Sequence, residues 1–84
     1  MNKKEIIFPF HLINRKAVDL SFLIRDNISR PLFIEKDNRC ANAKSLLGLL
    51  SLGLREGQSA NIISDNDEDI KKVEQIIKNL KEEL

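Results

Sequence analysis

Three features of this 84-residue chain carry groups that could do chemistry: one histidine, one cysteine and one run of acidic residues. The histidine, His11, has an imidazole that is a good nucleophile near neutral pH when it is uncharged. The cysteine, Cys40, has no second cysteine with which to form an internal disulfide. One histidine and one cysteine cannot make a metal site alone. We therefore expect no metal and no cofactor.

The acidic run at residues 65–69 begins like a calcium-binding loop. Such a loop needs a glycine at its sixth position and a glutamate at its twelfth, and this chain has Ile70 and Ile76 there. Asp and Asn are also common where helices begin, because they cap free N–H groups and complement the helix dipole. The run therefore predicts the start of a helix rather than a metal site.

Ser45 is a fourth candidate, because it precedes a leucine-rich stretch that predicts a short helix over residues 46–52. A serine at this position caps a helix by accepting a hydrogen bond from a backbone N–H one turn further on. Gly53 then supplies the left-handed residue that commonly ends a helix. A helix start also favours a phosphate, since the free N–H groups and the dipole both attract negative charge.

The elements that position these residues can be predicted from the spacing of apolar side chains. Alternation indicates a strand over residues 5–12, and helical spacing indicates a helix over residues 17–27. Short strands are expected at residues 32–35, 40–43 and 59–64, with a tight turn at 37–39 in which asparagine takes a positive φ. The last helix follows the acidic run, with an apolar stripe made by Ile70, Val73, Ile77, Leu80 and Leu84.

This pattern gives the order β-α-β-β-α-β-α in a single domain over residues 1–84. An amphipathic sheet with all of its helices on one face buries that set of apolar stripes most simply. We therefore expect an α+β fold with a four-stranded sheet and three helices on one face.

The overall charge and hydropathy exclude several classes of partner. The net charge of +1 gives no general attraction to nucleic acid, and no run of eighteen apolar residues predicts a membrane span. Residues 1–55 hold ten Lys and Arg against five Asp and Glu, while residues 56–84 hold four against eight. This asymmetry indicates either ordinary surface variation or an N-terminal part that faces an anion. The lone cysteine and the lack of a signal peptide predict a cytoplasmic protein.

The stretch from Asn42 to Gly53 reads N-A-K-S, two apolar residues, G, two apolar residues, then S-L-G. This pattern resembles the HPr family, the small proteins of the bacterial phosphoenolpyruvate-dependent sugar phosphotransferase system. The resemblance implies an HPr-like open-faced β-sandwich, in which three helices cover one face of a four-stranded antiparallel sheet. It also implies a protein that is not an enzyme and that works through protein partners.

The resemblance breaks at the residue that carries phosphate. Phosphocarrier members resemble G-L-H-A-R-P-A before the first helix, and their histidine accepts the phosphoryl group; this chain reads H-L-I-N-R-K-A there. Matching Arg15 to the motif arginine puts Ile13 at the histidine position, whereas counting back without gaps from Ser45 puts Asn14 there. Neither side chain can accept a phosphoryl group, as in the Crh-like variants of the family that lack this histidine. His11 stays open as a displaced acceptor or as a polar residue at the end of a strand.

The serine of the N-A-K-S pattern has a second role in the family. In Gram-positive HPr proteins it is phosphorylated by an ATP-dependent kinase, the HPr kinase/phosphorylase. The phosphorylated form is then a corepressor for a LacI-type regulator. The resemblance therefore implies regulatory phosphorylation at Ser45, although a serine that only caps a helix explains the pattern equally well.

A partner-binding surface is predicted around the same helix. Leu47 and Leu50 lie three residues apart on a helix too short to bury every leucine, so we expect them to form an exposed apolar patch. Arg15 and Lys44 are expected to flank this patch with positive charge. The chain is thus predicted to be a regulatory binding module. The alternatives are a phosphocarrier that uses His11 and a degenerate HPr paralogue with an unidentified partner.

Overall fold

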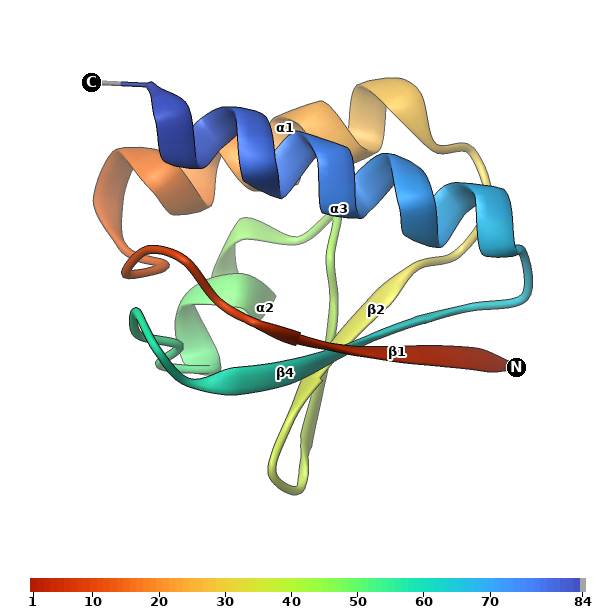
Figure 1. The fold of residues 1–84 in the computed structure, drawn as a ribbon, viewed down its shortest axis with the longest axis horizontal. Coiled ribbons are helices and arrows are strands. Elements are labelled where there is room, and N and C mark those ends of the chain that lie inside the picture. The colour runs from red at the N-terminus through yellow and green to blue at the C-terminus, as the bar shows by residue number, and fades with distance from the viewer. Residues whose placement is uncertain (84) are drawn as a thin grey trace.

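A computed structural model of the chain describes residues 1–83. Its elements are β1 (Asn2–Ile7), α1 (Asn14–Asn27), β2 (Phe33–Lys36), β3 (Arg39–Asn42), α2 (Leu46–Ser51), β4 (Ser59–Ser64) and α3 (Asp67–Glu82). The strands pair antiparallel in the order β1-β4-β2-β3. The helices cover one face of this sheet, with α1 and α3 packed side by side and α2 against α1 (Figure 1). The predicted α+β open-faced sandwich is confirmed. No helix within residues 1–83 is long and apolar enough to span a membrane.

The first strand begins and ends earlier than the predicted 5–12. Its alternation is real, since Phe8, Phe10 and Leu12 are all buried in the core. The Phe8 N–H still donates to the Gln58 carbonyl at 2.8 Å, but the next residue is Pro9, which has no N–H to continue the ladder. The chain therefore leaves the sheet while its side chains keep pointing into the core.

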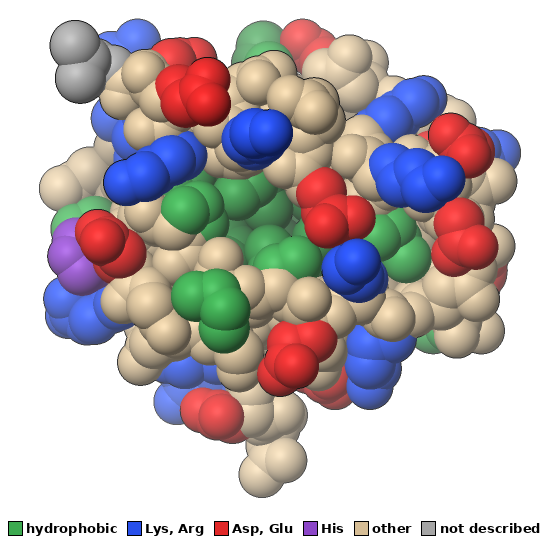
Figure 2. Space-filling model, viewed as in Figure 1, with side chains coloured by type: hydrophobic (Ala, Val, Ile, Leu, Met, Phe, Trp, Pro, Cys, Tyr) green, Lys and Arg blue, Asp and Glu red, His purple; other side chains and the backbone are tan. Residues whose placement is uncertain are grey.

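Helix α3 buries the predicted stripe of Ile70, Val73, Ile77 and Leu80 against the sheet, whereas Leu84 lies outside the described residues. Helix α1 begins at Asn14, three residues before the predicted start, and buries Ala17, Leu20 and Ile24. Some apolar surface is left in a hollow between α3 and β1, where it remains open to solvent (Figure 2).

The hairpin of β2 and β3 sets the position of α2. Its two-residue turn places the positive φ on Asp37, at 55°, rather than on the predicted asparagine. Aspartate also tolerates this left-handed conformation, so the turn is made without a glycine. Lys36 Nζ donates to the Gly53 carbonyl at 3.2 Å, and Arg39 donates to the Ser51 carbonyl at 2.7 Å. Both cations thus complement the carbonyl end of α2.

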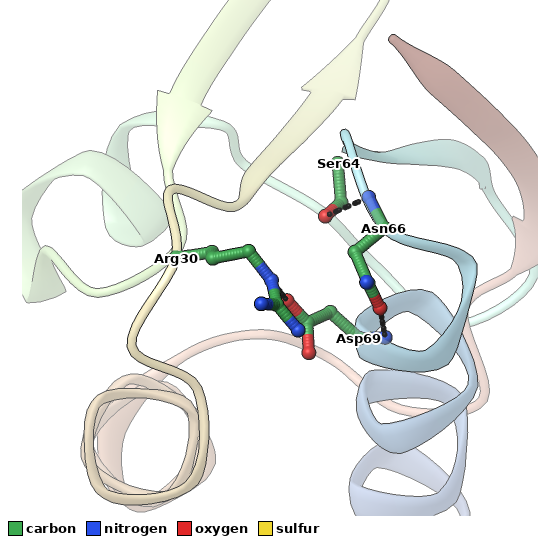
Figure 3. Close-up of polar contacts among 4 residues, drawn as sticks. All are labelled: Arg30, Ser64, Asn66 and Asp69. Carbon is green, nitrogen blue, oxygen red and sulfur yellow. Dashed lines mark hydrogen bonds and ion pairs between the residues drawn. The ribbon is translucent and has the colours of Figure 1, made fainter.

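The acidic run caps α3, as predicted. Asn66 is the N-cap, and its side-chain oxygen accepts from the Asp69 N–H at 3.1 Å. The Asp69 side chain is only 3% exposed and pairs with Arg30, with Nε and Oδ2 2.9 Å apart (Figure 3). Ser64 Oγ in turn accepts from the Asn66 N–H at 3.1 Å. This network ties the connection between α1 and β2 to the start of α3.

Candidate functional site

Ser45 caps α2 as the sequence predicts. Its backbone is extended, with φ −103° and ψ 118°, and its Oγ accepts from the Gly48 N–H at 3.1 Å. Its own carbonyl accepts from the Leu49 N–H at 3.0 Å, which starts the helical ladder. The hydroxyl therefore lies at the N-terminal end of α2, where backbone N–H groups and the helix dipole favour negative charge.

Gly48 leaves space for this cap. A Cβ built at Gly48 would lie 3.3 Å from both Cβ and Oγ of Ser45, and 3.4 Å from the Cβ of Ala41. The first two distances are tighter than ordinary van der Waals contact, so a larger residue would require the Ser45 side chain to shift by a few tenths of an ångström. Gly48 thus helps to fix where the Ser45 oxygen points.

Exposed apolar side chains lie on both α1 and α2, the helix that Ser45 caps. Helices α1 and α2 pack against each other, and Val18 and Phe22 share one side of α1 with Arg25, which reaches α2. We define the apolar patch by its four exposed side chains: Val18 (45% exposed), Phe22 (55%), Leu47 (78%) and Leu50 (40%). Leu49 between the two leucines is fully buried, so α2 separates its leucines into a core side and a solvent side.

Sequence reasoning found the two leucines of this patch but missed Val18 and Phe22. Both fall off the stripe that α1 buries, and they are spaced four residues apart. That spacing was the signal that could have identified them, because apolar residues outside the buried stripe of a helix form a second, exposed face.

Arg25 brings positive charge near Ser45 that the sequence did not predict. Arg25 Nη2 donates to the Lys44 carbonyl at 2.7 Å, which brings its guanidinium to the residue before the cap. Lys44 itself is partly buried, and its N–H donates to Asn42 Oδ1 at 2.9 Å. Arg15 pairs with Asp19 on α1, with Nε and Oδ1 3.5 Å apart, and it lies one turn before Val18 on that helix. The structure therefore brings Lys44 and Arg25 together.

The start of α1 holds both candidate positions for the missing histidine. Ile13 is the N-cap residue and makes no side-chain cap, although its carbonyl accepts from the N–H groups of Lys16 and Ala17. Asn14 has a φ of 50°, a left-handed conformation that costs most residues energy but that asparagine tolerates. No acidic residue lies in the first turn, which carries Arg15 instead. This helix end is electropositive but offers no nucleophilic nitrogen at residue 13 or 14.

His11 is held in a loop rather than at a helix end. Its Nδ1 accepts from the Glu56 N–H at 3.2 Å, and the adjacent Leu12 N–H donates to the Leu54 carbonyl at 2.9 Å. Because Nδ1 accepts this hydrogen bond, its lone pair is already engaged. The imidazole therefore ties the segment before α1 to the loop after α2.

Within residues 1–83 no three His, Cys, Asp or Glu side chains come together as metal ligands. Cys40 is exposed on β3 and forms no disulfide. One titratable group on the open face of the sheet is perturbed: the Asn61 amide, and then Lys3, hold the pKa of Glu35 below its ordinary value. Asn61 Nδ2 lies 3.1 Å and Lys3 Nζ 3.2 Å from Glu35 Oε1.

Comparison with known proteins gives one consistent match. Residues 14–82 match the family described as the PTS HPr component phosphorylation site. The chain is similar to HPr-like protein Crh of Halalkalibacterium halodurans, at 37% identity over 46 residues, which is 55% of each chain. It is also similar to HPr-like protein Crh of Bacillus subtilis, at 32% identity over 53 residues, which is 63% of this chain and 62% of that one. The chain thus spans little more than half the length of the curated relatives that it matches.

The fold has a solved counterpart over its whole length. The crystal structure of HPr-C-His from Thermoanaerobacter tengcongensis superimposes with a TM-score of 0.83 at 28% identity. The match covers 100% of this chain and 99% of that one. Both helices that form the apolar patch lie inside the matched region, as does the capped serine.

Proposed function

The chain belongs to the HPr family, and from that premise we propose that it is a regulatory binding module controlled by phosphorylation at Ser45. The observation that carries this proposal is the position of the Ser45 hydroxyl. It caps α2, the helix that also carries the exposed Leu47 and Leu50, so a phosphate there would change the charge of this helix's solvent side.

The proposal denies the chain the phosphocarrier role. Ordinary phosphotransfer in the family needs an imidazole ahead of the first helix, and this chain has Ile13 and Asn14 there. His11 is the alternative acceptor, but its Nδ1 already accepts a hydrogen bond from the Glu56 backbone. We therefore assign His11 a structural role in the loop and assign the chain no enzymatic activity.

A phosphate on Ser45 would be compatible with the fold. A dianion at the start of α2 interacts favourably with the helix dipole and with free N–H groups, by roughly 0.3–2 kcal/mol. Two cations are near this position: Lys44 precedes Ser45 in the chain, and the Arg25 guanidinium bonds the Lys44 carbonyl. Phosphorylation would thus join negative charge, flanking cations and the apolar patch into one composite surface.

The proposed partners are proteins. An HPr kinase/phosphorylase would modify Ser45, and a LacI-type regulator would bind the modified form through the apolar patch. We propose no direct contact with nucleic acid and no contact with a membrane, and we place the protein in the cytoplasm. A degenerate paralogue that binds some other protein without modification is the competing function.

Phosphorylation is tested with purified protein, ATP and an HPr kinase, followed by mass spectrometry. We expect one phosphate, located on Ser45, and none in Ser45→Ala. Ser51→Ala is the matched control, because Ser51 lies at the other end of α2 and its hydroxyl donates to the Gly48 carbonyl instead of capping the helix. A protein that stays unmodified contradicts the proposal and favours the competing function.

The phosphocarrier alternative is tested with phosphoenolpyruvate and Enzyme I. We expect no acid-labile phosphate on the protein. Label that disappears in His11→Gln would overturn our assignment and make the chain a phosphocarrier. Label that survives this substitution would have to lie on another side chain and would equally contradict the role proposed for the start of α1.

A further inference from the structure

Arg25 is a cation of α1 that no acidic side chain of the described chain balances. Arg15, on the same helix, pairs with Asp19, whereas Arg25 takes part in no ion pair among the described residues. Arg25 lies in the last turn of α1, where the free carbonyls of its own helix favour a cation. Its Nη2 nevertheless donates to the Lys44 carbonyl at 2.7 Å, and Lys44 is the residue before Ser45. The guanidinium therefore lies at the start of α2 instead.

The turn that Arg25 contacts is held by hydrogen bonds of its own. The Lys44 N–H donates to Asn42 Oδ1 at 2.9 Å, and the Ser45 N–H donates to the Asn42 carbonyl at 3.0 Å. The first turn of α2 contains no acidic residue, and Lys44 adds a second positive charge in front of it. The start of α2 is thus an ordered turn that carries two cations and no acid of its own.

The Lys44 carbonyl and the Ser45 hydroxyl are close because they belong to neighbouring residues. Only the peptide unit and the serine Cβ separate the two oxygens, so they lie no more than about 6 Å apart. A guanidinium has several N–H donors in a planar fork, and the Lys44 carbonyl takes one of those of Arg25. The oxygens of a phosphoryl group on Ser45 can therefore meet the remaining donors without a change of the backbone.

From these observations we propose that Arg25 is a positioning residue that holds a phosphate on Ser45, through the N–H groups that Lys44 does not use. This inference rests on the proposed phosphorylation of Ser45. The planar fork of a guanidinium matches two oxygens of one phosphate, so the bond would join α2 to α1. Arg25 shares one side of α1 with Phe22, three residues before it. A partner would therefore meet the phosphate in a fixed orientation, turned toward the α1 part of the apolar patch.

The role of Arg25 is tested in a chain that carries phosphoserine at residue 45 without the use of a kinase. Synthetic fragments 1–39 and 40–84 are ligated at Cys40, and the pKa of the phosphate is followed by ³¹P NMR. A bound guanidinium favours the dianion, so Arg25→Gln should raise this pKa by about 0.5 or more. Arg39→Gln is the matched control and should leave the pKa unchanged, because Arg39 bonds the Ser51 carbonyl at the other end of α2.

Two results of this titration would overturn the proposal. One is the same phosphate pKa in Arg25→Gln and in Arg39→Gln. The other is a rise in Lys44→Gln without a rise in Arg25→Gln, which would assign the phosphate to Lys44. If an HPr kinase leaves Ser45 unmodified, the proposed function fails and this titration is unaffected. An unchanged pKa with phosphoserine in place refutes the role of Arg25 alone.

Urea denaturation measures the link between the two helices. The phosphate should raise the urea midpoint of the chain, and this gain should be lost in Arg25→Gln and kept in Arg39→Gln. Without phosphate, Arg25→Gln should change the midpoint little, because its bond to the Lys44 carbonyl is exposed. An equal gain in both variants would contradict a bond between α1 and the phosphate. Circular dichroism checks that each variant is folded.

Discussion

The ion pair between Arg30 and Asp69 should be strongly asymmetric in its effect on stability. Asp69 is almost completely buried, with 3% of its side chain exposed, whereas 55% of the Arg30 side chain is exposed. Removing Arg30 leaves a buried carboxylate without its counter-ion. Removing Asp69 leaves an arginine that can turn to water. The first change should therefore cost more than the second, although the two residues form one interaction.

The magnitudes follow from the surroundings of each group. Loss of one partner of a fully buried pair costs about 3–5 kcal/mol. Two effects lower this cost for Arg30→Ala. Asp69 lies in the first turn of α3, where the helix dipole stabilises a carboxylate by roughly 0.3–1 kcal/mol, and water can solvate the carboxylate where Arg30 was. We expect Arg30→Ala to lower the free energy of unfolding by about 2 kcal/mol, and Asp69→Ala by about 1 kcal/mol. The double variant should cost about as much as Asp69→Ala, so that the second substitution rescues the first.

Urea denaturation followed by circular dichroism measures these differences. With a slope of about 1 kcal/mol/M, the midpoint of Arg30→Ala should fall by about 2 M and partly recover in the double variant. Phosphorylation of Ser45 should not change, since none of the hydrogen bonds of this network involves a residue of α2. Additive costs in the double variant, or a cost for Arg30→Ala below that for Asp69→Ala, would refute the burial argument.

Three further outcomes are expected. Ser45→Ala should lower the free energy of unfolding by about 1 kcal/mol through the lost cap, whereas Ser45→Asp should keep most of it; equal urea midpoints for the two would show that the cap is unimportant. Asn61→Ala should raise the pKa of Glu35 toward its ordinary value in an NMR titration. Because folding lowers this pKa, the contribution of Glu35 to stability is present above its ordinary pKa and is lost as the pH falls through the lowered one. Ile13→His should gain acid-labile phosphate from Enzyme I if the gapped alignment is correct, and Asn14→His should gain it if the ungapped one is; failure of both would mean that the start of α1 no longer forms the site. Lys16 stands at the motif proline in the gapped alignment and is kept in both variants, because its N–H donates to the Ile13 carbonyl and its ammonium to the Leu80 carbonyl.

The fold could be predicted from the sequence because its stripes are regular. The residues that alternate before α1 and those that recur every three or four along α3 are the ones that become buried. What periodicity could not give was the end of β1, since Phe8, Phe10 and Leu12 keep alternating after the chain has left the sheet. A strand ends where its ladder of backbone hydrogen bonds ends, and the pattern of buried side chains does not show where that is.

The candidate site was predictable only in its local part. Capping by Ser45 depends only on residues within one turn of helix. The exposure of Leu47 and Leu50 is local as well, because it depends on their positions around the short helix α2. The pairing of Arg25 with the Lys44 carbonyl joins residues nineteen apart, and only the packing of α1 on α2 creates it. Arg15, which was expected to flank the patch, pairs with Asp19 and lies one turn before Val18 on α1, so its role toward a partner stays a prediction.

If Ser45 is phosphorylated, its partner must read the change as charge rather than as a change of shape. The modified oxygen is the one that accepts from the Gly48 N–H, so the phosphate would occupy the cap position that the hydroxyl already holds. The helix end contributes roughly 0.3–2 kcal/mol to holding a dianion, which is small beside the 5–15 kcal/mol that stabilises a typical domain. An effect of this size cannot rearrange a packed core. It can decide binding, however, because the dianion would lie next to Leu47 and beside the arginine that α1 brings to Lys44. A regulator that carries cations opposite this position would therefore distinguish the two forms without any movement of α2.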